Sequence, residues 1–117
     1  MLAVSIILSM SFILSAVFMS VNQNDLYIDK SNIHGVGIFT SKKLDKEVIV
    51  FKCINKDQSI TDKGSKINHS YNPNTYVLEK NGEWFIVSNK KINKNEELTV
   101  NYNDTPSFIK KADKSWK

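Results

Sequence analysis

A long uncharged segment opens the chain and limits how much of it can fold as a water-soluble unit. Residues 1–21 contain no Asp, Glu, Lys or Arg, whereas charged and amide side chains are frequent from Asn22 onward. About ninety-five residues therefore remain to fold, which is enough for one domain with a small core.

The opening segment is long enough to cross a membrane, and we expect a hydrophobic helix there. A helix of this length reaches roughly 30 Å, the thickness of the hydrocarbon core. No basic residue precedes the segment, and Lys30, Lys42 and Lys43 follow it, so an anchored domain would face the cytoplasm. A signal peptide is disfavoured, because no Lys or Arg precedes the apolar region and the segment lacks a small-x-small cleavage site. A third alternative is translation from Met19, which would make the protein cytoplasmic.

The basic balance of the chain does not indicate nucleic-acid binding. The net charge is +4, but all sixteen basic residues are Lys, scattered among acidic residues. Surfaces that bind nucleic-acid phosphates usually include Arg, whose planar guanidinium makes bidentate contacts with phosphate. We therefore predict a solvated surface and no direct nucleic-acid contact.

Cysteine and histidine are too scarce for a metal centre. Cys53 is the single cysteine, which excludes an internal disulfide and an all-cysteine zinc site. Together with His34 and His69 it supplies too few soft ligands at a useful spacing. Cys53 stands in the apolar run "VIVFKCI", which predicts a buried and unreactive thiol. No metal is expected.

The remaining pattern predicts a mostly β domain with little helix. Alternating or β-branched runs are typical of strands, and Asn81-Gly82 is a preferred pair for a type I′ hairpin turn. Asn95 suits a left-handed turn position. A short helix is predicted at 108–114 and a polar loop at 55–66. The predicted strands are 25–30, 36–40, 46–54, 75–80, 83–87 and 97–102.

Three motifs occur in a fixed order along this β-rich region. They are "IHGVGIF", "INHSYNPN" and "NEELTVNY". Together they resemble the SET domain family of protein lysine methyltransferases, whose fold is a β-clip of short strands. The resemblance covers about residues 25–104, between the hydrophobic segment 1–21 and a tail at 105–117.

The resemblance implies a site for S-adenosylmethionine and the residues that form it. Gly35, Val36 and Gly37 would let the backbone approach the cofactor, because glycine lacks a Cβ. Asn68 and His69 would contact the same cofactor through main-chain groups and the Asn68 amide. In the same motif, Pro73 and Asn74 would fix the path of the chain out of the loop.

The resemblance also implies the reaction, which is methyl transfer to the ε-amine of a lysine on a protein partner. Tyr102 matches the catalytic tyrosine of the family and would orient the amine. Tyr71, Tyr76 and Phe108 are candidates for the substrate channel, and Trp116 is an alternative to Phe108 as its aromatic lid. The resemblance leaves the degree of methylation and the oligomeric state open.

Two departures from the family pattern leave alternatives open. The segment 55–66 is shorter than the usual substrate-binding insert, and the cysteine-rich zinc element after the domain is missing. A non-catalytic SET-like binding module with a reduced groove is therefore the main alternative. A secreted or membrane-bound β-rich adaptor is a third.

Overall fold

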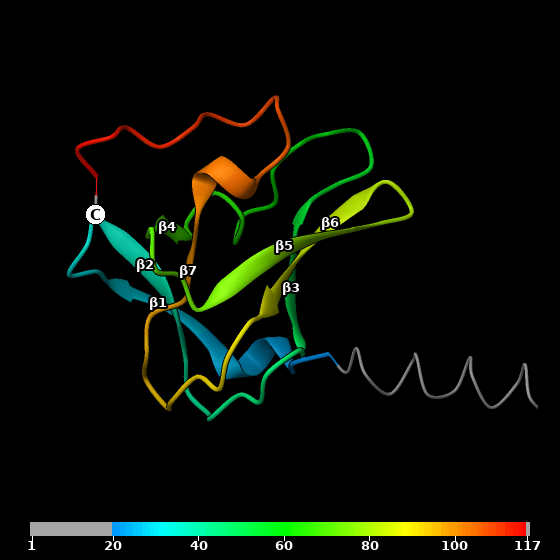
Figure 1. Ribbon diagram of the computed structural model, residues 1–117. Helices are drawn as coiled ribbons and strands as arrows, with labels where there is room; N and C mark the ends of the chain where they lie inside the picture. The colour runs from blue at the N-terminus through cyan, green and yellow to red at the C-terminus, as the bar shows by residue number, and fades with distance from the viewer. Residues whose placement is uncertain (1–19, 117) are drawn as a thin grey trace, which may run out of the picture.

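The computed structural model describes residues 20–116 as a set of short strands and two single-turn 3-10 helices (Figure 1). The predicted anchor lies almost wholly outside the described residues. Within residues 20–116, no helix is long and apolar enough to cross a membrane. The elements are η1 (Gln23–Asp25), β1 (Leu26–Lys30), β2 (Val36–Thr40), β3 (Ile49–Ile54), β4 (Asn68–His69), β5 (Thr75–Lys80), β6 (Glu83–Ser88), β7 (Thr99–Val100) and η2 (Tyr102–Asp104).

The strands form three small sheets. β1 and β2 are an antiparallel pair, β3, β6 and β5 form a three-stranded sheet in that order, and β4 pairs with β7 in parallel. In Figure 1, β4 and β7 lie between the β1–β2 pair and the three-stranded sheet. This shortest sheet is built from two of the three motifs.

The hairpin between β5 and β6 follows the prediction from its turn residues. Asn81 and Gly82 both have positive φ, at 55° and 82°, as a type I′ turn requires. Ile86 of β6 pairs with Phe51 of β3 and is buried, with an exposed fraction of 1%. Together with Ile38, Val50 and Leu98, Ile86 belongs to one core that all three sheets share.

Residues ahead of the predicted domain start at residue 25 contact β3. Ser20 forms a parallel bridge with Ile49, and the Val21 N–H donates to the Ile49 carbonyl at 2.8 Å. The Gln23 Nε2 amide donates to the carbonyl of Val50 at 2.7 Å. The last residues of the hydrophobic segment therefore belong to the folded domain.

Three predicted elements differ from those in the structure. The third strand starts at Ile49 rather than residue 46, because Glu47 has a positive φ of 64°. The last strand is reduced to β7, since the Asn101 side chain caps the 3-10 turn that starts at Tyr102. The predicted helix at 108–114 is absent from the described tail, which contains only isolated turns.

Candidate active site

A polar cluster of Ser31, Asn68 and Glu97 joins the three sequence motifs. The Asn68 Nδ2 group lies 2.8 Å from Glu97 Oε2 and 3.0 Å from Ser31 Oγ. It also lies 3.0 Å from the backbone carbonyls of His34 and Val36. Because an amide NH₂ has only two protons, these four acceptors share them. The cluster holds the glycine loop against the start of the parallel strand pair.

Glycine is required at the two positions of the first motif for different structural reasons. Gly35 has a φ of +50°, and a Cβ added there would meet no heavy atom within 4 Å. A Cβ on Gly37 would lie 2.2 Å from Oε2 of Glu97. Gly37 therefore makes room for the Glu97 carboxylate, whereas Gly35 permits a left-handed backbone beside open space. Val36, between them, is exposed.

Asn74 ties the exit of the middle motif to the last strand. Its Nδ2 donates to the Glu97 carbonyl at 2.8 Å, and its Oδ1 accepts from the N–H of Thr99 at 2.8 Å. The Pro73 carbonyl accepts from Asn89 Nδ2 at 3.2 Å. These bonds fix the chain's path after the loop, in the manner the motif predicts.

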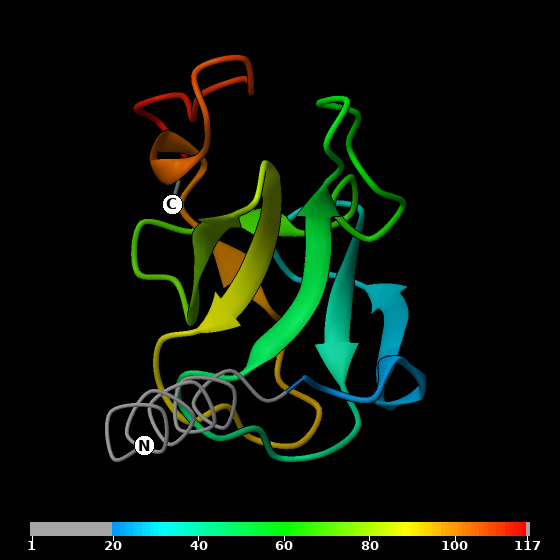
Figure 2. The ribbon, with the colours of Figure 1, turned by 90° about the vertical axis from the view of Figure 1, so that its right-hand side faces the viewer.

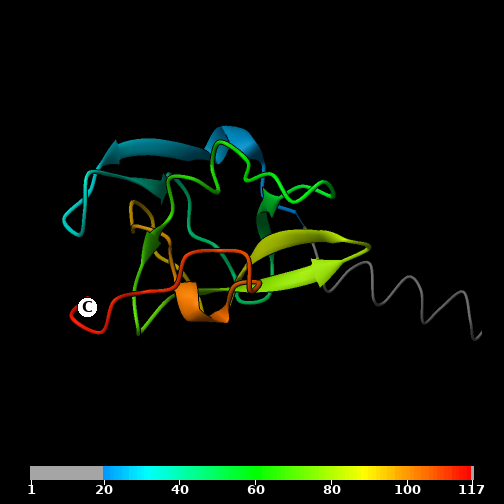
Figure 3. The ribbon, with the colours of Figure 1, turned by 90° about the horizontal axis from the view of Figure 1, so that it is seen from above.

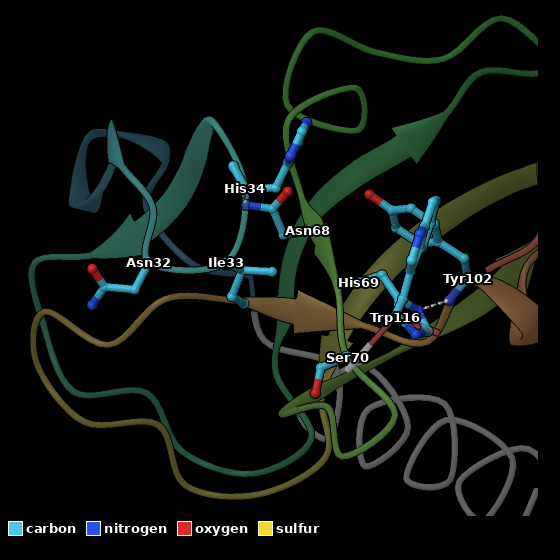
Figure 4. Close-up of a pocket in the computed structure, with 8 residues that line it drawn as sticks. All are labelled: Asn32, Ile33, His34, Asn68, His69, Ser70, Tyr102 and Trp116. Atoms are coloured by element: carbon cyan, nitrogen blue, oxygen red, sulfur yellow. Dashed lines mark hydrogen bonds between the residues drawn. The ribbon is translucent and has the colours of Figure 1, made fainter. Parts of the chain in front are cut away.

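His69 is buried and holds the backbone of Tyr102. The Tyr102 N–H donates to His69 Nδ1 at 3.1 Å, drawn as a dashed line in Figure 4. The proton of the neutral imidazole must therefore be on Nε2. Nε2 is buried without a hydrogen-bond partner among the described residues. Burial lowers the pKa of His69 below its usual 6.5, which favours this neutral form.

Tyr102 is fixed at both ends. Its hydroxyl donates to the Ile67 carbonyl at 2.6 Å, while its N–H is held by His69. Burial raises the pKa of Tyr102 above 10, so the phenol keeps its proton at neutral pH. The ring of Tyr102 thus lies against β4, at the point where the central sheet ends.

The larger cavity, of about 690 Å³, lies on one side of Tyr102 (Figure 4). This volume is within the usual range for small-molecule and cofactor sites. No Lys, Asp or Glu lines it, and its aromatic members are Tyr102 and Trp116. The lining residues are Asn32, Ile33, His34, Asn68, His69, Ser70, Tyr102 and Trp116.

A smaller cavity, of about 270 Å³, also has Tyr102 in its wall. Its lining is mainly aliphatic and comes from β3, β5, β6, β7, the loop 55–67 and the tail. The apolar members are Cys53, Ile54, Ile60, Ile67, Val77, Ile86, Val100 and Ile109, and the others are Gly64, Ser65, Tyr102, Thr105 and Lys110. Tyr102 is the one residue that the two described linings share.

The structure does not bring the three predicted channel residues to the smaller cavity. The Tyr76 hydroxyl donates to Glu47 Oε2 at 2.6 Å, and burial together with this bond raises the pKa of Tyr76 to about 12. Phe108 packs edge-on against Trp84, and Tyr71 packs edge-on against His69. None of the three is among the lining residues of either cavity. Trp84 packs against the core.

Sequence reasoning missed the residues that connect the motifs and close the smaller cavity. Ser31 and Glu97 are separated by 66 positions, so only the fold brings them together. Glu97 stands inside the third motif, which was a usable signal. No sequence signal pointed to Ile109 and Lys110, because the tail carries no motif. Within residues 20–116, no group of His, Cys, Asp and Glu is arranged to hold a metal ion.

Comparison with known proteins agrees with this geometry. A family model described as the SET domain matches residues 16–103. The chain belongs to the SET domain family. SET domains are generally protein lysine methyltransferases that use S-adenosylmethionine. None of the curated proteins matches the chain.

A solved structure shares the SET fold of this chain. It is the crystal structure of a Plasmodium falciparum protein described as a "putative histone methyltransferase". The TM-score is 0.56 at 21% sequence identity, over 68% of this chain and 93% of that one. At this identity the likeness concerns the fold alone, and the prediction of a mostly β domain with little helix is confirmed.

Proposed function

We propose that this SET domain transfers a methyl group from S-adenosylmethionine to the ε-amine of a protein lysine. The observation that carries the proposal is the place of Tyr102, the residue common to the two cavity linings. A methyltransferase must hold donor and acceptor on two sides of one reacting centre, because transfer requires an in-line approach. The larger cavity would hold the donor, and the smaller one the lysine side chain.

The larger cavity fits S-adenosylmethionine in the chemistry of its lining. The Nε2–H of His69 is a buried donor without a partner in the described part of the chain, and the backbone at Gly35 borders open space. Aromatic rings attract cations, so Tyr102 and Trp116 suit a sulfonium group. The NH₂ group of Asn68 donates its protons within the polar cluster. Asn68 therefore supports the glycine loop and does not donate from this group to a ligand.

The bound cofactor would supply an electrophilic methyl group, and the chain's own residues would prepare the amine. A lysine is mostly protonated at neutral pH, with a pKa of about 10.4. The aliphatic wall of the smaller cavity, including Ile67 and Val100, disfavours the charged form and so lowers the pKa of a lysine that enters. The hydroxyl of Tyr102 and the carbonyl of Ile67 would then orient the neutral amine.

The test compares Tyr102→Phe with Tyr27→Phe. Each substitution removes one hydroxyl, but Tyr27 bonds only to Asn95 Oδ1, at 2.9 Å, and lines neither cavity. With radiolabelled S-adenosylmethionine and a cell lysate as acceptor, Tyr102→Phe should lose about 100-fold in transfer rate, as expected when a reacting group is misplaced. Tyr27→Phe should retain the wild-type rate.

Calorimetry with S-adenosylhomocysteine separates this proposal from its alternative. The wild type and both variants should bind the ligand with similar affinity, because the tyrosine hydroxyls are not needed for the fit. Binding without transfer to any acceptor would favour a SET-like binding module, for which the short loop 55–66 is the supporting feature. Absence of binding at millimolar ligand would contradict the proposed methyltransferase.

A further inference from the structure

The tail 105–116 forms one side of the smaller cavity. Thr105, Ile109 and Lys110 line it from the tail, opposite Ile60 and Gly64 from the loop 55–67. Figures 1 and 2 show the tail, in orange and red, and this green loop at the same end of the molecule. Seen from above, the tail runs across the domain from η2 toward the chain end (Figure 3). Ile109 packs against the buried core.

The tail is held in place by bonds at several points, although it has no regular secondary structure. The Ala112 N–H donates to Asn103 Oδ1 at 3.0 Å, and the Tyr71 hydroxyl donates to the Asp113 carbonyl at 2.9 Å. At its end, Trp116 lies with its ring centroid 6.0 Å from His69 and 6.1 Å from Tyr102. The tail therefore passes from the smaller cavity to the larger one.

Lys110 occupies a distinctive position on this path. It is the single lysine among the described residues that line the two cavities. Its Nζ lies 5.9 Å from the ring centroid of Trp116 and makes no ion pair or hydrogen bond within residues 20–116. By contrast, the Nζ of the adjacent Lys111 donates to the carbonyls of Thr105 and Pro106 at 2.7 and 3.0 Å.

We propose that Lys110 is an intramolecular methyl acceptor, so that the protein modifies its own tail. The inference rests on the proposed function, because it assigns a substrate to the same site. The ring nearest the Lys110 amine is the ring that neighbours Tyr102, and Lys110 is itself one of the residues that line the apolar cavity. Methyl transfer would require the side-chain torsions of Lys110 to turn its amine into this cavity while the backbone of the tail stays bound.

The step is a substitution at carbon. The neutral Lys110 amine uses its lone pair to form a C–N bond to the methyl carbon as the C–S bond of S-adenosylmethionine breaks. The electron pair of that bond remains on sulfur, which gives S-adenosylhomocysteine. The methylated ammonium of Lys110 then releases its proton to water. No oxidant, metal or further reactant is required.

The main experiment incubates the purified full chain with S-adenosylmethionine and maps the methyl group by peptide mass spectrometry. We expect methylation of Lys110 in the wild type and in Lys114→Arg, a matched control in the same tail, and none in Lys110→Arg. The methylated fraction at a given time should not change when the protein is diluted tenfold, because the reaction is intramolecular. Methylation at other lysines with Lys110 unmodified would overturn the inference.

A second readout needs no cofactor and tests whether the tail is docked. Trypsin should cleave after Lys110 slowly in the wild type, because a bound segment must detach before it is cut. Ile109→Asn places a polar amide against the apolar cavity without adding a charge beside the cleaved bond, and should accelerate that cleavage about tenfold. Cleavage after Lys94, in the turn before β7, should not change. Equal cleavage rates after Lys110 in wild type and Ile109→Asn would contradict the docked tail.

The two proposals fail in distinguishable ways. If the chain binds S-adenosylhomocysteine and methylates a lysate protein while Lys110 stays unmodified, the inference about Lys110 is wrong and the proposed function stands. If neither ligand binding nor methylation of any acceptor is found, the proposed function itself is wrong, and the inference falls with it.

Discussion

The backbone N–H of Tyr102 donates to Nδ1 of the buried His69 at 3.1 Å, which links the middle motif directly to the last one. His69 has an exposed fraction of 4%, and its imidazole is the acceptor for this N–H. His69 therefore stabilises the fold, independently of any contact that it makes with a ligand. The bond also fixes the starting point of η2, whose first residue is Tyr102.

Removing this imidazole should destabilise the fold. His69→Ala leaves the Tyr102 N–H unpaired and opens a cavity between Tyr71 and Tyr102, so we expect a loss of about 2–4 kcal/mol in unfolding free energy by urea denaturation. His69→Asn keeps an acceptor close to the position of Nδ1 and should recover part of the loss. His34→Ala, at an exposed site, should change stability by less than about 0.5 kcal/mol. Equal effects at positions 34 and 69 would refute the structural role of His69.

The same histidine should make stability depend on pH. Burial lowers the pKa of His69 in the folded state below its ordinary 6.5, so the unfolded chain binds the proton more tightly. Stability should therefore be fully present above pH 6.5 and fall as the pH drops below it, at no more than about 1.4 kcal/mol per pH unit from one proton. Urea unfolding at pH 7.5 and 5.5 measures the effect. His69→Asn should show a smaller difference between the two pH values, and an unchanged difference would assign the dependence to other groups.

Features that depend on neighbouring residues could be predicted from the sequence, and features that depend on distant ones could not. Asn81-Gly82 and Asn95 adopt the positive φ expected of them, because the side chain itself sets that preference. The order of the three motifs was sufficient for the SET family. Residues 108–114 of the tail were predicted as a short helix, but the tail bonds to Asn103 and Tyr71, which lie outside it, and these bonds favour an irregular path.

The candidate site shows the same division. Gly37 was predicted as a site glycine, but the reason for it is the carboxylate of Glu97, which is 60 positions away in the sequence. The aliphatic side chains of the smaller cavity come from strands whose pattern predicts only burial. Nothing local distinguishes Ile67, beside the Tyr102 hydroxyl, from an ordinary core residue.

The contact between Gly37 and Glu97 predicts a coupled pair. Gly37→Ala would place a methyl group 2.2 Å from Glu97 Oε2, which forces the carboxylate away from Ser31 and Asn68. We expect a loss of about 1–3 kcal/mol in unfolding free energy. In the Glu97→Ala background the same substitution should cost much less, because the clash is gone. Additive effects in this double-mutant cycle would show that the two positions do not interact.

Cys53 should be unreactive in the folded protein. Burial raises the pKa of its thiol to about 12, and the thiol donates to the Trp84 carbonyl at 3.4 Å. Because the thiolate is the nucleophile, this shift alone should slow alkylation by iodoacetamide at pH 8 by about 1000-fold relative to the unfolded chain. Intact mass measured over time, with and without urea, follows the reaction. Native labelling at the rate of the unfolded chain would mean that Cys53 is accessible.

The phenol of Tyr102 predicts the shape of the pH–rate profile for methyl transfer. Its pKa is raised above 10 by burial, so the hydroxyl stays protonated and bonded to the Ile67 carbonyl throughout the range from pH 7 to 9.5. The rate should rise over this range, since a larger fraction of the acceptor lysine is neutral at higher pH. Tyr102→Phe should be slower at every pH but follow the same upward curve. A fall in the wild-type rate above pH 8.5 that Tyr102→Phe does not share would show instead that this tyrosine ionises in the working range.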